Sequence, residues 1–162
     1  MIDKNKRKVH GIKFEYGDII NGTDYPSESF DKILFLEVIE HLPKNTEKQA
    51  LKEIHRLLKK GGTMVLSTPN DTLLTAIFDP AYWLIGHRHY KINDIKKMLR
   101  DSGFTIESDY IGGGVAELLW IPFFYILLKL KLDKPITPII NRFIDREYRT
   151  KGFYTIIIKC TK

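Results

Sequence analysis

The chain has 162 residues, and its 26 Lys and Arg outnumber its 20 Asp and Glu, which gives a formal net charge of +6. The hydrophobic fraction of 43% and the charged fraction of 28% are typical of one globular domain and exclude a mainly disordered chain. A single cysteine excludes a disulfide framework and a cysteine-rich zinc module. Residues 1–8 are charged and lack the apolar core of a signal peptide, so we expect a cytoplasmic protein.

The positive charge does not by itself predict a nucleic-acid partner. Residues 4–8 form one short basic cluster, whereas the other basic residues are spread along the chain among acidic ones. The sequence contains no zinc-finger spacing and no interleaving of aromatic and basic residues. We therefore expect a solvated basic surface and no nucleic acid as a partner.

The first part of the chain predicts two strands and a helix. Residues 12–16 alternate apolar and polar, which is the period of an edge strand with one wet face. Residues 33–36 form a continuous apolar run, which predicts a central parallel strand buried on both faces. Thr46 and Gln49 have the spacing of a capping box at a helix start. Gly61 is predicted to end that helix in the left-handed conformation.

The second part of the chain predicts further strands and another helix. Residues 64–66 form a short apolar strand. Asn93 is predicted to cap a helix that ends near Gly103. Residues 104–110 and 154–158 complete the set of strands, and the last of these is rich in β-branched side chains. Strands that alternate with helices predict an α/β architecture with a largely parallel sheet.

Polar segments follow the predicted strands, where ligands of open α/β sheets bind. These segments are residues 17–19, 37–42 and 67–70. Acidic residues in the first two fit a ligand with hydroxyls, amines or a positive charge. The glycines at 112–114 lack the Lys-Ser/Thr of a nucleotide triphosphate site, so the sequence predicts no phosphate loop.

Five segments, in their order along the chain, resemble class I S-adenosylmethionine-dependent methyltransferases. The segments are 17–19 (Gly-Asp-Ile), 29–33 (Ser-Phe-Asp-Lys-Ile), 37–42 (Glu-Val-Ile-Glu-His-Leu), 53–62 and 67–70. The small-molecule and lipid-type enzymes, such as ubiquinone-biosynthesis-like methyltransferases, are the most similar. This resemblance covers roughly residues 12–110 and the last strand. It implies a Rossmann-like α/β fold, S-adenosylmethionine as the cofactor, and methyl transfer to a small or lipid-like acceptor.

The resemblance also assigns cofactor contacts. It implies that Asp18 accepts a hydrogen bond from the adenine amino group and that the Ile19 backbone meets the adenine edge. It places Glu37 and Val38 along the cofactor beside the reacting methyl group. Asp18 has a competing interpretation as a simple turn residue.

Candidate catalytic and substrate-facing residues follow from the chemistry of an in-line displacement, which needs alignment and sometimes a base. His41 is the first candidate base and His89 the second, although His41 could instead only orient its loop. Asn70, His87 and Tyr90 are expected to face the substrate. Because no cysteine or carboxylate cluster adjoins the histidines in the sequence, we expect no metal.

One part of the family's cofactor site is missing from this sequence. That site begins with a strand, a Gly-rich turn and a helix, and a second strand then ends in an acid. We therefore expect residues 1–162 to form a single, partial methyltransferase domain, N-terminally truncated, with the first two strands missing. The family's last four strands then stay contiguous in the order four-five-seven-six. The strand at 12–16 is isolated, which makes a homodimer or a complementing chain a partner to test.

Residues 118–128 are apolar throughout, but the run is too short to span a bilayer and a proline interrupts it. The resemblance places the run in an insertion or cover region, residues 112–152, between the last two strands. Trp120 and Phe124 would then line a lid over an apolar or lipid-linked acceptor. Alternatively, residues 118–134 form an interfacial anchor with peripheral membrane contact, or the run is an extra core or dimer helix.

The sequence therefore predicts a truncated methyltransferase domain that uses S-adenosylmethionine and acts on a small-molecule or lipid-like acceptor. The alternative is a non-catalytic, degenerate domain that acts in protein–protein or membrane-surface binding. The predicted location is cytoplasmic, with a membrane-peripheral location if the anchor interpretation holds.

Overall fold

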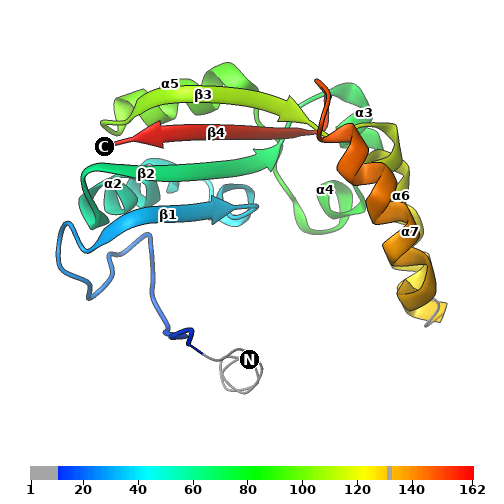
Figure 1. The fold of residues 1–162 in the computed structure, drawn as a ribbon, viewed down its shortest axis with the longest axis horizontal. Helices are drawn as coiled ribbons and strands as arrows, with labels where there is room; N and C mark the ends of the chain where they lie inside the picture. Colours follow the sequence, from blue (N-terminus) through cyan, green and yellow to red (C-terminus); the bar gives the residue numbers. More distant parts are fainter. Residues whose placement is uncertain (1–10, 131–132) are drawn as a thin grey trace.

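The computed structural model describes residues 11–130 and 133–162, and its centre is a four-stranded sheet (Figure 1). The strands are β1 (Phe30–Leu36), β2 (Leu58–Pro69), β3 (Thr105–Gly112) and β4 (Thr155–Thr161), in the order β1-β2-β4-β3. β1 and β2 are parallel, and β4 is antiparallel to both β2 and β3. This is the contiguous order that the sequence resemblance implies for the last four strands.

Helices fill the connections between the strands. The bounds are η1 (Ile39–His41, a single 3-10 turn), α2 (Glu47–Leu57), α3 (Leu73–Phe78), α4 (Pro80–Ile85), α5 (Ile92–Asp101), α6 (Val115–Leu130) and α7 (Asp133–Glu147). α6 and α7 fall between β3 and β4 in the chain and pack against each other. Among the described residues, no helix combines the length and the apolar character that crossing a membrane requires.

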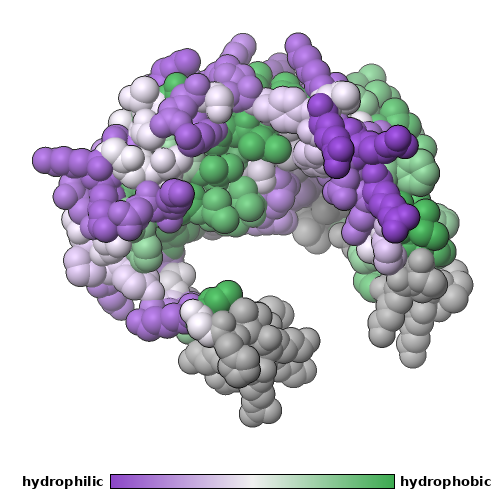
Figure 2. Space-filling view, viewed as in Figure 1, coloured by the Kyte–Doolittle hydropathy of each residue, from purple (hydrophilic) through white to green (hydrophobic). Residues whose placement is uncertain are grey.

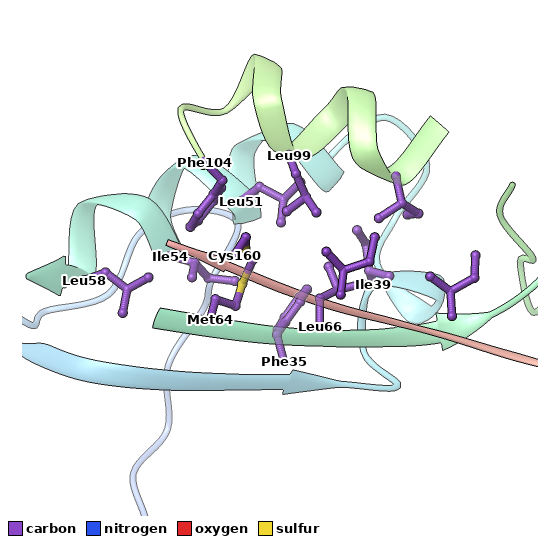
Figure 3. Packing of buried hydrophobic residues seen from close by; sticks show 13 residues of the cluster. Phe35, Ile39, Leu51, Ile54, Leu58, Met64, Leu66, Leu99, Phe104 and Cys160 are labelled. Carbon is purple, nitrogen blue, oxygen red and sulfur yellow. The ribbon is translucent and has the colours of Figure 1, made fainter. Parts of the chain in front are cut away.

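The hydrophobic core lies between one face of the sheet and the two helices α2 and α5 (Figure 3). Leu51 and Ile54 of α2 and Leu99 of α5 pack against strand side chains that include Met64 and Leu66. All five side chains are at most 1% exposed. Because each helix has one apolar face, packing these faces on the sheet removes both from water. We call this side of the sheet the covered face.

The opposite side of the sheet, the open face, carries Leu34, Leu36, Val65 and Ile157. Leu34 is 69% exposed and Leu36 46% exposed. The prediction that residues 33–36 are buried on both faces is therefore wrong for this side. Side chains alternate between the faces of a strand, and both α2 and α5 pack on the covered face.

Residues 12–16 form no strand, so the predicted edge strand is wrong. A strand needs a neighbour for its N–H and C=O groups, and among the described strands β1 pairs with β2 alone. The chain before β1 is instead attached to α2. Glu53 Oε1 accepts hydrogen bonds from the N–H and the hydroxyl of Thr23, both at 2.8 Å. Arg56 donates to the carbonyl of Tyr25 at 2.9 Å.

The predicted helix ends agree with the structure only in part. Thr46 is the residue before α2 but its side chain makes no capping hydrogen bond, so the capping box is absent. Gly61 has the left-handed conformation (φ +73°), but it lies inside β2 and does not end the helix. Asn93 is the second residue of α5 rather than its cap. Gly103 (φ +97°) follows α5 as predicted.

Candidate functional site

A cavity of about 800 Å³ opens on the open face, at the carboxyl ends of β1 and β2. Leu36, Val65 and Ile157 form its sheet side, and Trp120 and Phe124 of α6 form the opposite wall. Figure 2 shows apolar side chains gathered over this part of the sheet. The open face is therefore one wall of a site large enough for a small organic ligand.

Glu37 follows β1 directly and lines the cavity. Its backbone has a left-handed conformation, with φ of 52°, which turns the chain sharply at the strand end. Its carboxylate accepts a hydrogen bond from Ser67 Oγ at 2.6 Å. Loss of hydration around the carboxyl group raises the pKa of Glu37 to about 7, and nearby Glu40 contributes to the increase. Such a group can exchange a proton with a ligand near neutral pH.

One wall of the cavity continues into a cluster of two carboxylates and two histidines. Asp79 Oδ2 lies 2.6 Å from His87 Nδ1 and 2.9 Å from His89 Nε2. Glu40 Oε2 accepts a hydrogen bond from Thr68 Oγ1 at 3.0 Å, and Glu40 Oε1 lies 3.8 Å from His87 Nε2. The hydrogen bond with Asp79 is the main reason that the pKa of His87 rises to about 9. His87 is therefore protonated at neutral pH when this cluster holds no other cation.

Arg88 lies between these histidines in the chain, but its side chain does not line the cavity. It binds to the turn that follows β1. Its guanidinium donates to the carbonyl of Ile39 at 3.2 Å and pairs with the carboxylate of Glu47. The Tyr90 hydroxyl lies within hydrogen-bond distance of Ile39 O, at 3.3 Å, and of Glu47 Oε1, at 3.2 Å, and shares its one proton between them. These contacts fix η1, so that Glu40 stays at the cavity wall.

The α6 side of the cavity combines aromatic rings with an acid. The ring centroids of Trp120 and Phe124 lie 5.5 Å apart. Glu117 accepts a hydrogen bond from the Tyr148 hydroxyl at 2.9 Å, and burial raises the pKa of Glu117 to about 7. Among the described residues that line the cavity, four are carboxylates and none is Lys or Arg. Among these lining residues, protonated His87 is the one cation set against the four carboxylates, so the cavity of this basic chain carries more acidic than basic groups, which favours a cationic ligand.

The structure brings five of the predicted site residues together. Glu37, His41, His87, Trp120 and Phe124 all line the cavity. The exposed ring of His41 stacks on that of His87, with 4.6 Å between the centroids.

Four other predicted residues do not line this cavity. Val38 precedes η1 and is 36% exposed. The side chain of His89 is 1% exposed, so it is closed off from the cavity. Asn70 and Tyr90 form a β-bridge with each other, and the Asn70 amide donates to the carbonyl of Phe153 at 2.9 Å. Asn70 and Tyr90 therefore connect segments of the fold.

Asp18 and Ile19, predicted to contact adenine, lie in the loop before β1. Asp18 lines a separate cavity of about 380 Å³. Its carboxylate accepts hydrogen bonds from the Asn21 amide at 2.7 Å and the Ile20 N–H at 2.9 Å, and these bonds lower its pKa. Ile19 packs against the core of the covered face. The observed geometry is that of a self-contained turn.

Sequence reasoning missed Asp79 and Glu117. Asp79 stands eight and ten residues before His87 and His89, a spacing that could have identified it as a partner of both. Glu117 is the one acid next to a long apolar run, and no sequence signal shows that α6 turns it toward the strand ends.

A family model for a methyltransferase domain matches residues 2–109 of the chain. A curated S-adenosylmethionine-dependent methyltransferase from Mycolicibacterium smegmatis is 30% identical over 96 residues, which is 57% of this chain and 37% of that protein. The chain thus spans little more than a third of the curated relative that it matches.

Solved structures share the fold at low sequence identity. One is a chain in the complex between the Haloferax volcanii Trm112 methyltransferase activator and a methyltransferase, with a TM-score of 0.64, 15% identity and coverage of 99% of this chain and 67% of that one. Another is a sarcosine dimethylglycine methyltransferase from Galdieria sulphuraria, with a TM-score of 0.62, 14% identity and coverage of 99% and 63%. These likenesses show a common Rossmann-like sheet with its helices.

Proposed function

This chain belongs to the class I S-adenosylmethionine-dependent methyltransferases, and we propose that it forms part of an enzyme that methylates a small or lipid-like acceptor. The observation that carries this proposal is the acid-rich cavity at the strand ends. S-Adenosylmethionine supplies a methyl group from a sulfonium cation. Carboxylates without a competing Lys or Arg among the described lining residues fit that cation.

Within this proposal, Glu37 lies beside the reacting methyl group at the end of β1, whereas Val38 follows it in the chain and does not line the cavity. Asp18 and Ile19 lie in the loop before β1. Asp18 lines the smaller cavity, and Ile19 packs against the hydrophobic core. Their proposed contacts with adenine therefore require a cofactor that extends from one cavity to the other.

The acceptor side of the cavity is the wall formed by Trp120 and Phe124, which suits an apolar body. Of the two candidate histidine bases, His41 lines the cavity and His89 does not, so we retain His41. Glu37 is a competing base because its raised pKa allows it to take up a proton near neutral pH. A Glu37→Gln variant whose turnover falls by more than its weakened cofactor binding accounts for would assign the proton to Glu37.

Cofactor binding tests the proposed function directly. We expect 13C-methyl-labelled S-adenosylmethionine, added at millimolar concentration, to show a shifted methyl NMR signal that saturates with this chain. Glu37→Gln should weaken the binding, whereas the matched control Glu28→Gln, an exposed acid at a distance from the cavity, should leave it unchanged. No saturable shift at all would contradict the proposal and favour a degenerate, non-catalytic domain.

We also propose that the cofactor site of this chain is partial. This proposal is supported by the absence of a Gly-rich turn between a strand and a helix ahead of β1 in the sequence, and by coverage of 60–67% of three structural neighbours. Binding of S-adenosylmethionine should then be weak. Tight binding measured by calorimetry would contradict the truncation while supporting methyl transfer.

Membrane-surface binding is the second candidate function, and exposed apolar side chains on α6 favour it. Leu119 and Phe123 are 51% and 46% exposed, whereas the neighbouring Phe124 faces the cavity. Phe123→Ser and Phe124→Ser form a matched pair for flotation with anionic vesicles. If α6 contacts a membrane surface, Phe123→Ser should abolish flotation and Phe124→Ser should keep most of it. No flotation of the unmodified chain would dismiss the membrane candidate.

A further inference from the structure

Asp79, His87 and His89 have the composition and geometry of a metal-binding site. Their candidate ligand atoms all lie within 4.8 Å of one another, and Asp79 Oδ2 is in hydrogen-bond contact with a nitrogen of each ring. An ion among these atoms would need ligand distances of about 2.0–2.2 Å, which small side-chain movements could provide. Two imidazoles and one carboxylate form the donor set of catalytic zinc and non-haem iron sites.

The fold brings these three residues together through α4. Asp79 is the last residue before this helix, and His87 and His89 follow shortly after it. α4 is only six residues long, and the segment after it runs back past the start of the helix, which places His87 and His89 against Asp79. The sequence predicts no metal, because no carboxylate cluster adjoins the histidines along the chain. The structure supplies Asp79 from one side and Glu40 from the other.

Burial is a second, independent observation. The side chains of His89, Asp79 and Glu40 are 1%, 5% and 0% exposed. Glu40 Oε1 and His87 Nε2 are both buried and make no hydrogen bond within the described part of the chain, although they lie only 3.8 Å apart. Protonated His87 and Glu40 form an ion pair at this distance, but buried polar atoms that lack a hydrogen bond are rare and costly, so the missing hydrogen bond requires an explanation.

A metal on His87 Nδ1 would provide that explanation. The ring proton would then stay on Nε2, which faces Glu40 Oε1. A metal-bound histidine whose other nitrogen donates to a carboxylate is a recurring arrangement that fixes the ring and strengthens the ligand. Glu40 would thus be a positioning residue for His87.

The cavity gives an ion a path to this site, because Asp79 and His87 line it. A second set, Glu40, His41 and His87, also brings ligand atoms within 4.8 Å of one another. His41 is exposed, whereas the side chains of Asp79 and His89 are held inside the protein. The buried set is therefore better preorganised.

We propose that Asp79, His87 and His89 bind one divalent transition-metal ion at the edge of the cavity, with Glu40 orienting His87. Imidazole ligands favour ions such as Zn²⁺, Fe²⁺ or Co²⁺ over Mg²⁺ and Ca²⁺. Coordination positions not filled by the protein would face the cavity. Metal binding at this site does not depend on methyl transfer, so its test is separate from that of the proposed function.

The test uses the full chain, prepared without a histidine tag and stripped with a chelator. Zn²⁺ titration by calorimetry should give one ion per chain, and Co²⁺ should give the visible absorption of a bound, non-octahedral ion. Asp79→Asn and His89→Ala should each weaken Zn²⁺ binding by more than about 100-fold, since they remove ligands. Glu40→Gln should weaken it by roughly 10–100-fold, the usual effect of losing such a partner.

Two controls make the result decisive. His55→Gln, a histidine of α2 outside the cluster, and His41→Ala should both keep the affinity for Zn²⁺. Circular dichroism of every variant, with and without Zn²⁺, separates loss of the site from loss of the fold. The proposal is overturned by absent Zn²⁺ binding, by binding that survives in a folded Asp79→Asn variant, or by equal affinity for Mg²⁺. Loss of binding in His41→Ala alone would place the ion on the other set and also overturn it.

Discussion

The two faces of the sheet differ in what they contribute to the protein. On the covered face, side chains such as Met64, Leu66 and Ile158 are fully buried under α2 and α5. On the open face, Leu34 and Leu36 keep much of their surface exposed. The same strands supply both sets, because their side chains alternate between the two faces.

This difference separates folding from ligand binding. Burial of apolar area on the covered face is the main source of stability for a domain of this kind. The open face instead forms the sheet side of the cavity, where Leu36, Val65 and Ile157 meet the carboxylates at the strand ends. Substitutions on the covered face should therefore affect the free energy of unfolding, and substitutions on the open face should affect ligand binding.

The largest expected effect is on the covered face. Leu66→Ala should lower the free energy of unfolding by about 2–5 kcal/mol, because it leaves a cavity in a fully packed core. Val65→Ala is the matched control, since Val65 is the neighbouring residue of β2, is half-buried and points to the open face. Urea unfolding followed by circular dichroism measures both. Equal losses for the two variants would contradict the distinction between the faces.

A smaller effect concerns the attachment of the chain before β1 to α2. Hydrogen bonds, first of all from Arg56, lower the pKa of Glu53 from 4.5 to about 2. The folded state therefore has the lower pKa, so this contribution to stability is complete above about pH 4.5 and is lost as the pH falls toward 2. At neutral pH, Glu53→Gln should cost about 1–3 kcal/mol.

Unfolding curves of both proteins between pH 2 and 7 test this prediction. The difference in the free energy of unfolding should shrink as the pH falls and approach zero near pH 2. A difference that stays constant over the whole range would show that the Glu53 carboxylate contributes nothing through its charge.

Much of the sheet could be predicted from the sequence. The apolar runs at 33–36 and 64–66 lie within strands, and the run at 154–158 does so from Thr155 onward, because continuous β-branched and aliphatic residues favour extended, buried backbone. The apolar run at 33–36 did not predict that one face of this strand is open. An apolar sequence favours burial, but it does not show whether a helix packs on each face of the sheet. Residues 12–16 failed for a similar reason: their alternation suits a strand, but no described strand pairs with them.

The candidate site was predicted less completely. Glu37, His41 and His87 could be placed near the strand ends because loops after parallel strands converge there. Asp79 could not, because its contact with the histidines depends on how the chain reverses around α4. Glu117 depends in the same way on the direction of α6. Contacts that depend on how the chain turns around a helix, or on the direction of that helix, leave little trace in residue spacing.

The smallest expected effect is on the open face. Leu34 is 69% exposed, so Leu34→Gln should change the free energy of unfolding by no more than about 0.5 kcal/mol. Chemical unfolding at two protein concentrations tenfold apart is the measurement. A loss comparable with that of Leu66→Ala, present only at the higher concentration, would mean that a second copy of the chain covers Leu34 in solution. The open face would then be an interface between copies, and its contrast with the covered face would hold for the monomer alone.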